Sequence, residues 1–206
     1  MNTLHLVRHG HTLWNDTGGV AGRTDIALSD RGREAVDALR PSLQALLDGL
    51  ARPPVWVCSS LQRTAETANR LADGATVMRD ARLVELDFGD WEGSTWEAVH
   101  RDHEAQLADW GEDWVDGAPP NGESFRQQIA RCADWLEGVQ AGSAETVIAV
   151  SHGGSIRALL SLLLGHAPRD AMRFRIDPAH VCRIDREGRG WRLRASNLAG
   201  FVAAGE

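Results

Sequence analysis

Short apolar runs alternate with longer amphipathic segments in the first part of the chain. The runs have the length and composition of buried strands and occur at residues 4–7, 55–58 and 75–78. Apolar positions with helical spacing lie between them, first after the typical N-cap residue Ser29 and again over residues 61–71. Pro41 is expected to kink or divide the first helix. The resulting order, β-α-β-α-β, is typical of an α/β fold with a mostly parallel sheet.

The pattern changes between residues 85 and 122. Four of the eight tryptophans fall here among acidic residues and short helical stretches: Trp91, Trp96, Trp110 and Trp114. We interpret this segment as a small helical cap inserted over the sheet. Because no repeat or low-complexity linker interrupts the chain, we expect a single domain over residues 1–206.

The last part of the chain returns to regular patterns. A helix with one apolar face is expected after Gly122, followed by a strand at residues 146–150. Residues 156–164 are apolar almost all round, which is typical of a buried helix, and Gly165 is a typical residue to end it. The predicted fold closes with two strands, at residues 181–184 and 191–195, which are joined by a glycine-containing turn at residues 186–190.

Two of the predicted strands end at a His-Gly pair. His9 and Gly10 follow the first strand, and His152 and Gly153 follow the strand at residues 146–150. In α/β sheets, ligands bind at the carboxyl ends of the strands, so both histidines can meet at one site, with Arg8 beside them. Alternatively, each histidine only caps a strand.

A third strand ends at Cys58, and Arg63 follows it near the start of the next helix. Cysteine phosphatases hold a phosphate between a thiolate and an arginine that are separated by five residues, whereas only four residues intervene here. This spacing argues against a cysteine nucleophile. Arg63 remains a candidate anion ligand, because helix N-termini also favour phosphate.

The segment 85–93 holds four acidic residues, and most acidic side chains are simply solvated. Glu85 differs because it lies between Val84 and Leu86. A carboxyl held among apolar neighbours and opposite a phosphate keeps its proton longer, as a general acid must. We therefore expect Glu85 to be the acid of the site.

Composition excludes several classes of protein. The chain has no lysine, so P-loop and Schiff-base chemistry lack their central residue, and the net charge of −7 argues against nucleic-acid binding. The three cysteines do not form an even set for disulfides, which predicts a reducing, cytoplasmic environment. The chain lacks a long apolar run, which predicts that it does not bind a membrane. The histidine spacings do not match a zinc signature, and we expect no metal.

Taken together, several motifs in one order resemble the histidine phosphatase superfamily. They are residues 6–12 (LVRHGHT) with Asn15, residues 22–25 (GRTD), residues 59–68 (SSLQRTAETA) and residues 151–153 (SHG). His11 stands where a glutamate is common. The resemblance covers nearly the whole chain and implies a three-layer α/β/α sandwich with a mostly parallel central sheet and the cap at about residues 85–122.

The resemblance also implies a mechanism for phosphate monoesters without metal or cofactor. His9 would attack phosphorus to form a phosphohistidine, while Arg8, Arg63 and a charged His152 hold the phosphoryl oxygens. Glu85 would protonate the leaving alkoxide and then activate water. The remaining contacts to phosphate or substrate would come from Asn15, Gly22 and Gly153.

The motifs do not decide among three branches of the family, which differ in their substrates. Residues 85–93 and 119–124 look like the phosphatase branch and most like α-ribazole phosphatase, although Asn121 stands where a glycine is expected. Phosphoglycerate mutases carry Thr-Gly where this chain has Ala21 and Gly22, and a broad phosphomonoesterase shares nearly every motif. A phosphate-binding module without catalysis is the remaining alternative.

Overall fold

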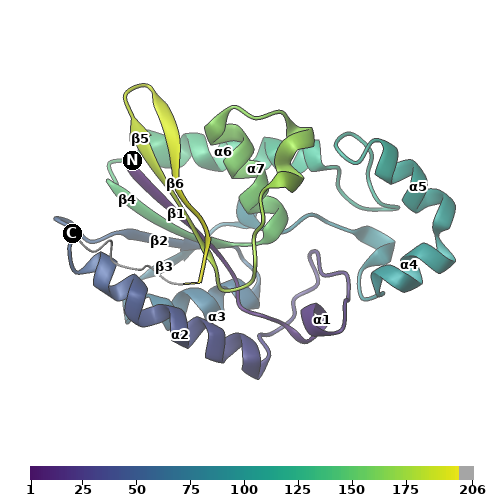
Figure 1. Cartoon of the computed structure of the whole chain (residues 1–206), viewed down its shortest axis with the longest axis horizontal. Coiled ribbons are helices and arrows are strands. Elements are labelled where there is room, and N and C mark those ends of the chain that lie inside the picture. Colours follow the sequence, from purple (N-terminus) through teal and green to yellow (C-terminus); the bar gives the residue numbers. More distant parts are fainter. Residues whose placement is uncertain (200–206) are drawn as a thin grey trace.

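The computed structural model describes residues 1–199, without the side chain of Leu46. Its centre is one six-stranded sheet with the order β3-β2-β4-β1-β5-β6 (Figure 1). The strands are β1 (Thr3–Arg8), β2 (Val55–Cys58), β3 (Val77–Arg79), β4 (Thr146–Ser151), β5 (Val181–Glu187) and β6 (Gly190–Leu198). The first four strands run parallel, and the β5–β6 hairpin pairs antiparallel with β1. The mostly parallel sheet that the sequence predicts is confirmed.

Helices cover both faces of this sheet and make the predicted three-layer sandwich. In Figure 1, α2 (Asp30–Leu47) and α3 (Gln62–Leu71) lie below the sheet, and α6 (Phe125–Ala141) and α7 (Gly153–Leu164) lie above it. The alternation of side chains along the strands divides the core. Leu4 and Leu6 pack into the layer with α6 and α7, whereas Val7 packs against α2 and α3.

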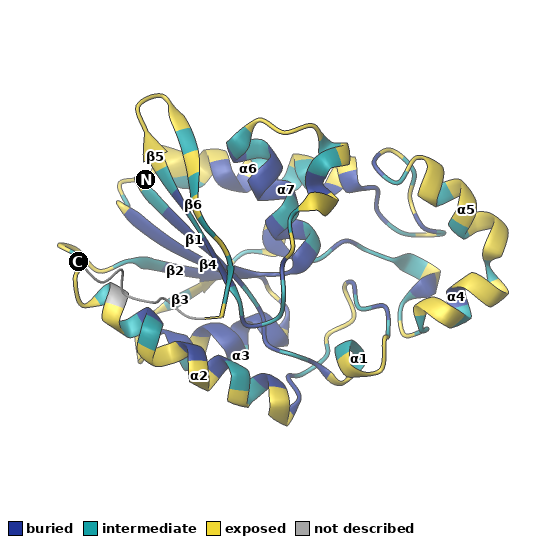
Figure 2. Cartoon of the chain, in the orientation of Figure 1, coloured by how far each residue is buried: buried dark blue, intermediate teal, exposed yellow. Residues whose placement is uncertain are grey.

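The register of the two central strands determines where the motifs meet. Arg8 of β1 lies opposite Ser151 of β4 at the end of their parallel pairing. His9 and His152 are the next residues of the two strands, so they leave the sheet side by side. Figure 2 shows that β1, β4 and much of α7 are buried, which makes the surroundings of both histidines rigid and dry.

The prediction that Pro41 divides the first long helix is wrong. α2 continues as one helix from Asp30 to Leu47 with Pro41 inside it. Proline removes the hydrogen bond to the carbonyl of Asp37, but both residues are exposed and water can replace that bond. Leu39 and Leu43 are fully buried on either side of the proline, and their packing holds the helix together.

The segment interpreted as a cap contains three short helices. They are η2 (Gly89–Trp91), α4 (Trp96–Asp102) and α5 (Glu104–Glu112). Val20, Trp91 and Val99 form a small core of their own beneath them, whereas α5 has no buried residue. The cap therefore extends from the main body, at the right of Figures 1 and 2, with most of its helical surface exposed.

Three further short helices were not predicted: α1 (Leu13–Asp16), η1 (Ala81–Leu83) and η3 (Pro168–Arg173). The strand expected at residues 75–78 begins at Val77, and the β5–β6 hairpin is longer than expected. Within residues 1–199, no helix is long and apolar enough to cross a bilayer. The end of the predicted domain, residues 200–206, lies outside the described residues.

Candidate active site

The predicted site residues come together at the carboxyl ends of the parallel strands. The rings of His9 and His152 lie edge to face with their centroids 5.1 Å apart. Arg63, in the first turn of α3, places its Nε 3.3 Å from Nδ1 of His152. Glu85, in the loop after η1, binds the first turn of α7 next to His152. Residues from four distant parts of the sequence thus form one constellation.

A single hydrogen bond fixes the tautomer of His9. Its Nδ1 lies 2.7 Å from the carbonyl oxygen of Gly10, which only accepts, so Nδ1 carries the proton. Burial, and then the charges of Arg63 and Arg8, lower the pKa of His9 well below its ordinary value. The ring is therefore neutral, and the lone pair of Nε2 is free to attack.

The tautomer of His152 is fixed from both sides. Arg63 Nε can only donate, so Nδ1 of His152 accepts, and His152 Nε2 donates its proton to Ser59 Oγ at 2.7 Å. Ser59 Oγ continues to Thr64 Oγ1 at 2.8 Å. Burial and the charge of Arg63 lower the pKa of His152 well below its ordinary value. A cationic neighbour and burial both disfavour the charge, so His152 is neutral in this structure; the charged His152 implied by the resemblance concerns the phosphate-bound site and stays a prediction.

Arg63 is fully buried, and its guanidinium holds a loop of the backbone. Its two terminal nitrogens donate to the carbonyl oxygens of Gly22 at 2.6 Å and Thr24 at 2.8 Å. Glu92 binds the same loop from the cap side. Its carboxylate accepts hydrogen bonds from the backbone N–H groups of Arg23 and Thr24 at 2.6 and 2.7 Å. A Cβ at Gly22 would collide with the Glu92 carboxylate, so only glycine fits there.

Glu85 is surrounded by hydrogen-bond donors. Its carboxylate accepts from the backbone N–H of Leu86 at 3.0 Å, from Gly154 N–H at 3.0 Å to each oxygen, and from Gln128 Nε2 at 3.1 Å. The apolar neighbours expected from the sequence are present, since Val84 and Leu86 are buried, but the carboxylate itself is bound by polar donors. Gly154 lies in the first turn of α7, so the helix N-terminus also faces the carboxylate.

The two remaining predicted contacts differ in what they do. Asn15 Oδ1 accepts from the backbone N–H and hydroxyl of Thr12 at 3.0 and 3.1 Å and caps α1. A Cβ at Gly153 would lie 3.1 Å from Arg157 Nη1 and 3.7 Å from the guanidinium carbon of Arg8. Gly153 therefore leaves room for two arginines beside the histidines, whereas Asn15 stabilises the start of a helix.

Comparison with known proteins agrees with this geometry. The model of histidine phosphatase superfamily branch 1 matches residues 4–199. The chain belongs to the histidine phosphatase superfamily. It is therefore an enzyme of the phosphatase and mutase type, as the sequence predicts.

Three relatives illustrate the range of the family. A probable phosphoglycerate mutase of Erwinia tasmaniensis is 29% identical over 93% of this chain and 88% of its own length. A glucosyl-3-phosphoglycerate phosphatase of Mycolicibacterium vanbaalenii is 34% identical over 79% of this chain and 74% of its own length. The crystal structure of the alpha-ribazole phosphatase from Shigella flexneri superimposes with a TM-score of 0.82, at 28% identity, covering 96% of this chain and 97% of that one.

This histidine phosphatase carries one further arginine that the sequence analysis missed. Most of its arginines pair with a carboxylate, and within residues 1–199 the only ones that do not and are not exposed are Arg8, Arg63 and Arg157. Arg157 Nε is held by the carbonyl oxygen of Phe174 at 3.0 Å, which leaves the end of the guanidinium for a ligand. Its signal in the sequence is a charge inside an otherwise apolar helix.

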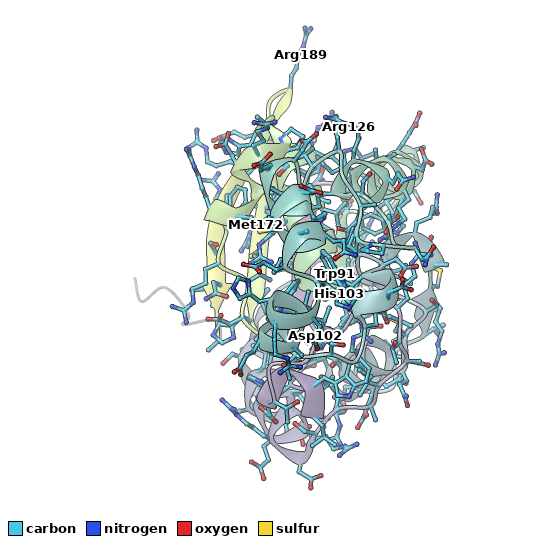
Figure 3. All side chains as sticks on the ribbon, turned by 90° about the vertical axis from the view of Figure 1, so that its right-hand side faces the viewer. Trp91, Asp102, His103, Arg126, Met172 and Arg189 are labelled. Carbon is cyan, nitrogen blue, oxygen red and sulfur yellow. The ribbon has the colours of Figure 1, made fainter. Side chains whose placement is uncertain are left out.

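A cavity of about 110 Å³ opens beside Glu85. Its polar lining comes from Glu85, Gln128, Gly154 and Arg157, and its apolar lining from Leu86, Phe88, Trp110, Trp114, Phe125 and Met172. Met172 and the cap residues Asp102 and His103 lie on the side of the molecule that faces the viewer in Figure 3, where the buried Trp91 is also labelled. The cavity thus lies between the strand ends and the cap, on the side of the group expected to protonate the departing alcohol.

Proposed function

We propose that this histidine phosphatase hydrolyses phosphate monoesters through a phosphohistidine on His9. The observation that carries the proposal is the hydrogen bond from His9 Nδ1 to the Gly10 carbonyl, because it leaves Nε2 unprotonated in a buried, positively charged site. In the first step, Nε2 forms a bond to phosphorus while the ester P–O bond breaks. Glu85 gives its proton to the departing alkoxide.

In the second step, water attacks the phosphohistidine. Glu85 takes a proton from that water, the new P–O bond forms, and the P–N bond to His9 breaks to release inorganic phosphate. Arg8 and Arg63 stabilise the negative charge that moves over the phosphoryl oxygens in both steps. The same negative charge beside His152 favours its protonated form when phosphate is bound. No step needs a metal or a cofactor.

For the substrate, we propose α-ribazole 5′-phosphate first. Two features support it: the name of the Shigella flexneri neighbour, and the aromatic lining of the cavity beside Glu85. Trp110 or Trp114 would stack on the flat base of the alcohol. The cavity of about 110 Å³ is smaller than the roughly 300–1,000 Å³ typical of sites for drug-sized ligands, so it would hold only part of this alcohol.

A second class of substrate is favoured by Arg157. An unpaired, half-buried guanidinium beside Glu85 suits an alcohol that carries a carboxylate close to the ester oxygen. Two relatives are named after phosphorylated or glucosylated glycerates. Phosphoglycerate mutase activity and broad phosphomonoesterase activity are therefore tested together with the first proposal.

The experiment is a parallel assay with chelator present throughout. Phosphate release is measured from α-ribazole 5′-phosphate, 3-phosphoglycerate and a neutral aryl phosphate, and isomerisation of 3-phosphoglycerate is followed in the same samples. Preference for the first substrate supports the α-ribazole assignment. Preference for 3-phosphoglycerate that disappears in Arg157→Gln supports the carboxylate class, and similar rates on all three support a broad phosphatase.

Two outcomes of this assay contradict the proposed mechanism itself. If no substrate turns over, the result supports the alternative of a phosphate-binding module without catalysis. If activity needs an added divalent ion and is lost with chelator, the metal-free mechanism is wrong. Phosphoprotein that is stable in base and labile in acid, lost in His9→Ala, is the expected signature of the intermediate.

A further inference from the structure

Gln128 is a fully buried polar side chain on the core face of α6. Its Nε2 donates two hydrogen bonds, to Glu85 Oε1 at 3.1 Å and to Ser155 Oγ at 3.0 Å. Ser155 in turn donates to the carbonyl oxygen of Val84 at 2.5 Å. Gln128 Oε1 is buried and has no hydrogen-bond partner. A glutamine here is costly, because buried polar atoms without partners destabilise the folded state.

The other partners of Glu85 serve only one of its two protonation states. Leu86 N–H and Gly154 N–H are backbone donors fixed in direction, and they match an ionised carboxylate. The proposed mechanism, on which this inference rests, requires Glu85 to carry a proton before the first step and to lack it before the second. A protonated carboxyl has an O–H donor, which backbone N–H groups cannot accept.

A primary amide can pair with both states, because one end donates and the other accepts. Turning the Gln128 amide by half a rotation brings Oε1 to face Glu85, and it breaks no hydrogen bond of Oε1 since that atom has none. The Ser155 hydroxyl is free to rotate and to donate to Oε1 in place of the Val84 carbonyl.

We propose that Gln128 is a positioning residue that hydrogen-bonds Glu85 in both of its protonation states by reversing its amide. Gln128 acts through Glu85, although its side chain also contributes to the wall of the cavity. Before the ester binds, Oε1 accepts the proton of Glu85. When the ester binds, its oxygen takes over that proton, and after the transfer Nε2 donates to the ionised carboxylate.

The charged groups around Glu85 do not change over the working pH range. Four guanidinium groups face it, those of Arg8, Arg63, Arg131 and Arg157, from β1, α3, α6 and α7. The thiol of Cys132 and the rings of His9 and His152 also titrate nearby. Burial raises the pKa of Cys132 to about 12 and lowers the pKa values of both histidines well below their ordinary value, so all three are neutral in the free enzyme, on which kcat/KM reports. A shift in the pH profile after a change at Gln128 therefore reports on Glu85.

The test compares Gln128→Met with the parent enzyme. Methionine keeps the length of the side chain but has neither amide donor nor acceptor. The variant loses the Nε2 donor to the ionised Glu85 carboxylate and the Oε1 acceptor for the protonated carboxyl. The first of these hydrogen bonds is charge-assisted and stronger, so its loss disfavours the ionised form more. We expect the alkaline limb of kcat/KM, which reports protonated Glu85, to move up by about one pH unit, with kcat about tenfold lower.

Two controls separate this inference from simpler explanations. Gln140→Leu changes an exposed glutamine of the same helix and should leave both parameters at the parent values. Thermal unfolding identifies a variant that has merely lost its fold, and Gln128→Leu is then measured in its place. A lower kcat with an unmoved alkaline limb, or no change at all, overturns the role of Gln128.

The outcome is also distinguishable from failure of the proposed function. If His9→Ala is inactive and the alkaline limb of the kcat/KM profile of Gln128→Met stays at the parent position, only the positioning role of Gln128 is wrong. If His9→Ala retains the parent activity, the phosphohistidine mechanism is wrong.

Discussion

The strand ends and the cap differ in the burial of their residues and in the kind of contact that holds them. At the strand ends, His9, Arg63 and His152 are buried, and each ring or guanidinium is fixed by hydrogen bonds of 2.6–3.3 Å. In the cap, α5 has no buried residue, and its Trp110 packs by apolar and ring contacts, with its ring stacked on that of Trp96 at a centroid distance of 6.3 Å. Under the proposed function, the first region determines which bond breaks, and the second influences which alcohol leaves.

The largest effect should come from removing the nucleophile at the strand ends. His9→Ala leaves the phosphate ligands but no atom to form the P–N bond, so kcat should fall by about 10⁴-fold or more. Phosphate release and acid-labile phosphoprotein report the loss. His11→Ala, which changes a half-buried histidine paired with Asp16, is the matched control and should retain most activity.

Arg63→Gln should lower kcat by roughly 10²–10³-fold, because it removes a cationic ligand of the phosphoryl group. It should also lower the melting temperature, since the carbonyl oxygens of Gly22 and Thr24 lose their partner. Steady-state kinetics and thermal unfolding measure the two effects. Equal activity in the variant and the parent would show that Arg63 only supports the loop.

The buried histidines should make stability depend on pH. Burial lowers the pKa of His5 to about 4 and places those of His9 and His152 well below 6.5. The unfolded chain therefore binds more protons as the pH falls below about 6.5, and the folded state loses up to about 1.4 kcal/mol per pH unit for each histidine. Denaturant midpoints at several pH values test this, and midpoints that stay constant between pH 7 and 5 contradict it.

The smallest effects are expected in the cap. Trp110→Leu removes one wall of the cavity but no hydrogen bond that the structure shows, so turnover of a simple aryl phosphate should stay within about threefold of the parent. Selectivity for α-ribazole 5′-phosphate should fall by about tenfold if the indole stacks on the base. An unchanged ratio of kcat/KM values for the two substrates would remove Trp110 as a specificity residue.

The sequence predicted the meeting of His9, Arg63 and His152 because each follows a strand, and parallel strands end at the same edge. It did not predict the tautomer of His152, because the proton on a ring depends on neighbours such as Ser59 that only the fold brings near. Gln128 lies between Phe125 and Cys132 on the apolar face of its helix, and a polar residue at such a position is the signal that was available.

Arg157 was missed for a related reason. Its hydrogen-bond partner Phe174 and its charged neighbour Arg8 come from other elements, and helical spacing alone does not show which arginines lack a carboxylate. Pro41 was misjudged because the rule for proline in helices considers the backbone, whereas Leu39 and Leu43 hold the helix through their buried side chains.

The loop at residues 22–24 bears on how this enzyme can evolve. Arg63 and Glu92 hold it through backbone atoms, one from α3 and one from the cap. Mutations that change the side chain of Arg23 therefore leave these attachments in place. Selection can vary the side chain at this position freely, while inheritance of the loop conformation depends on very few other positions.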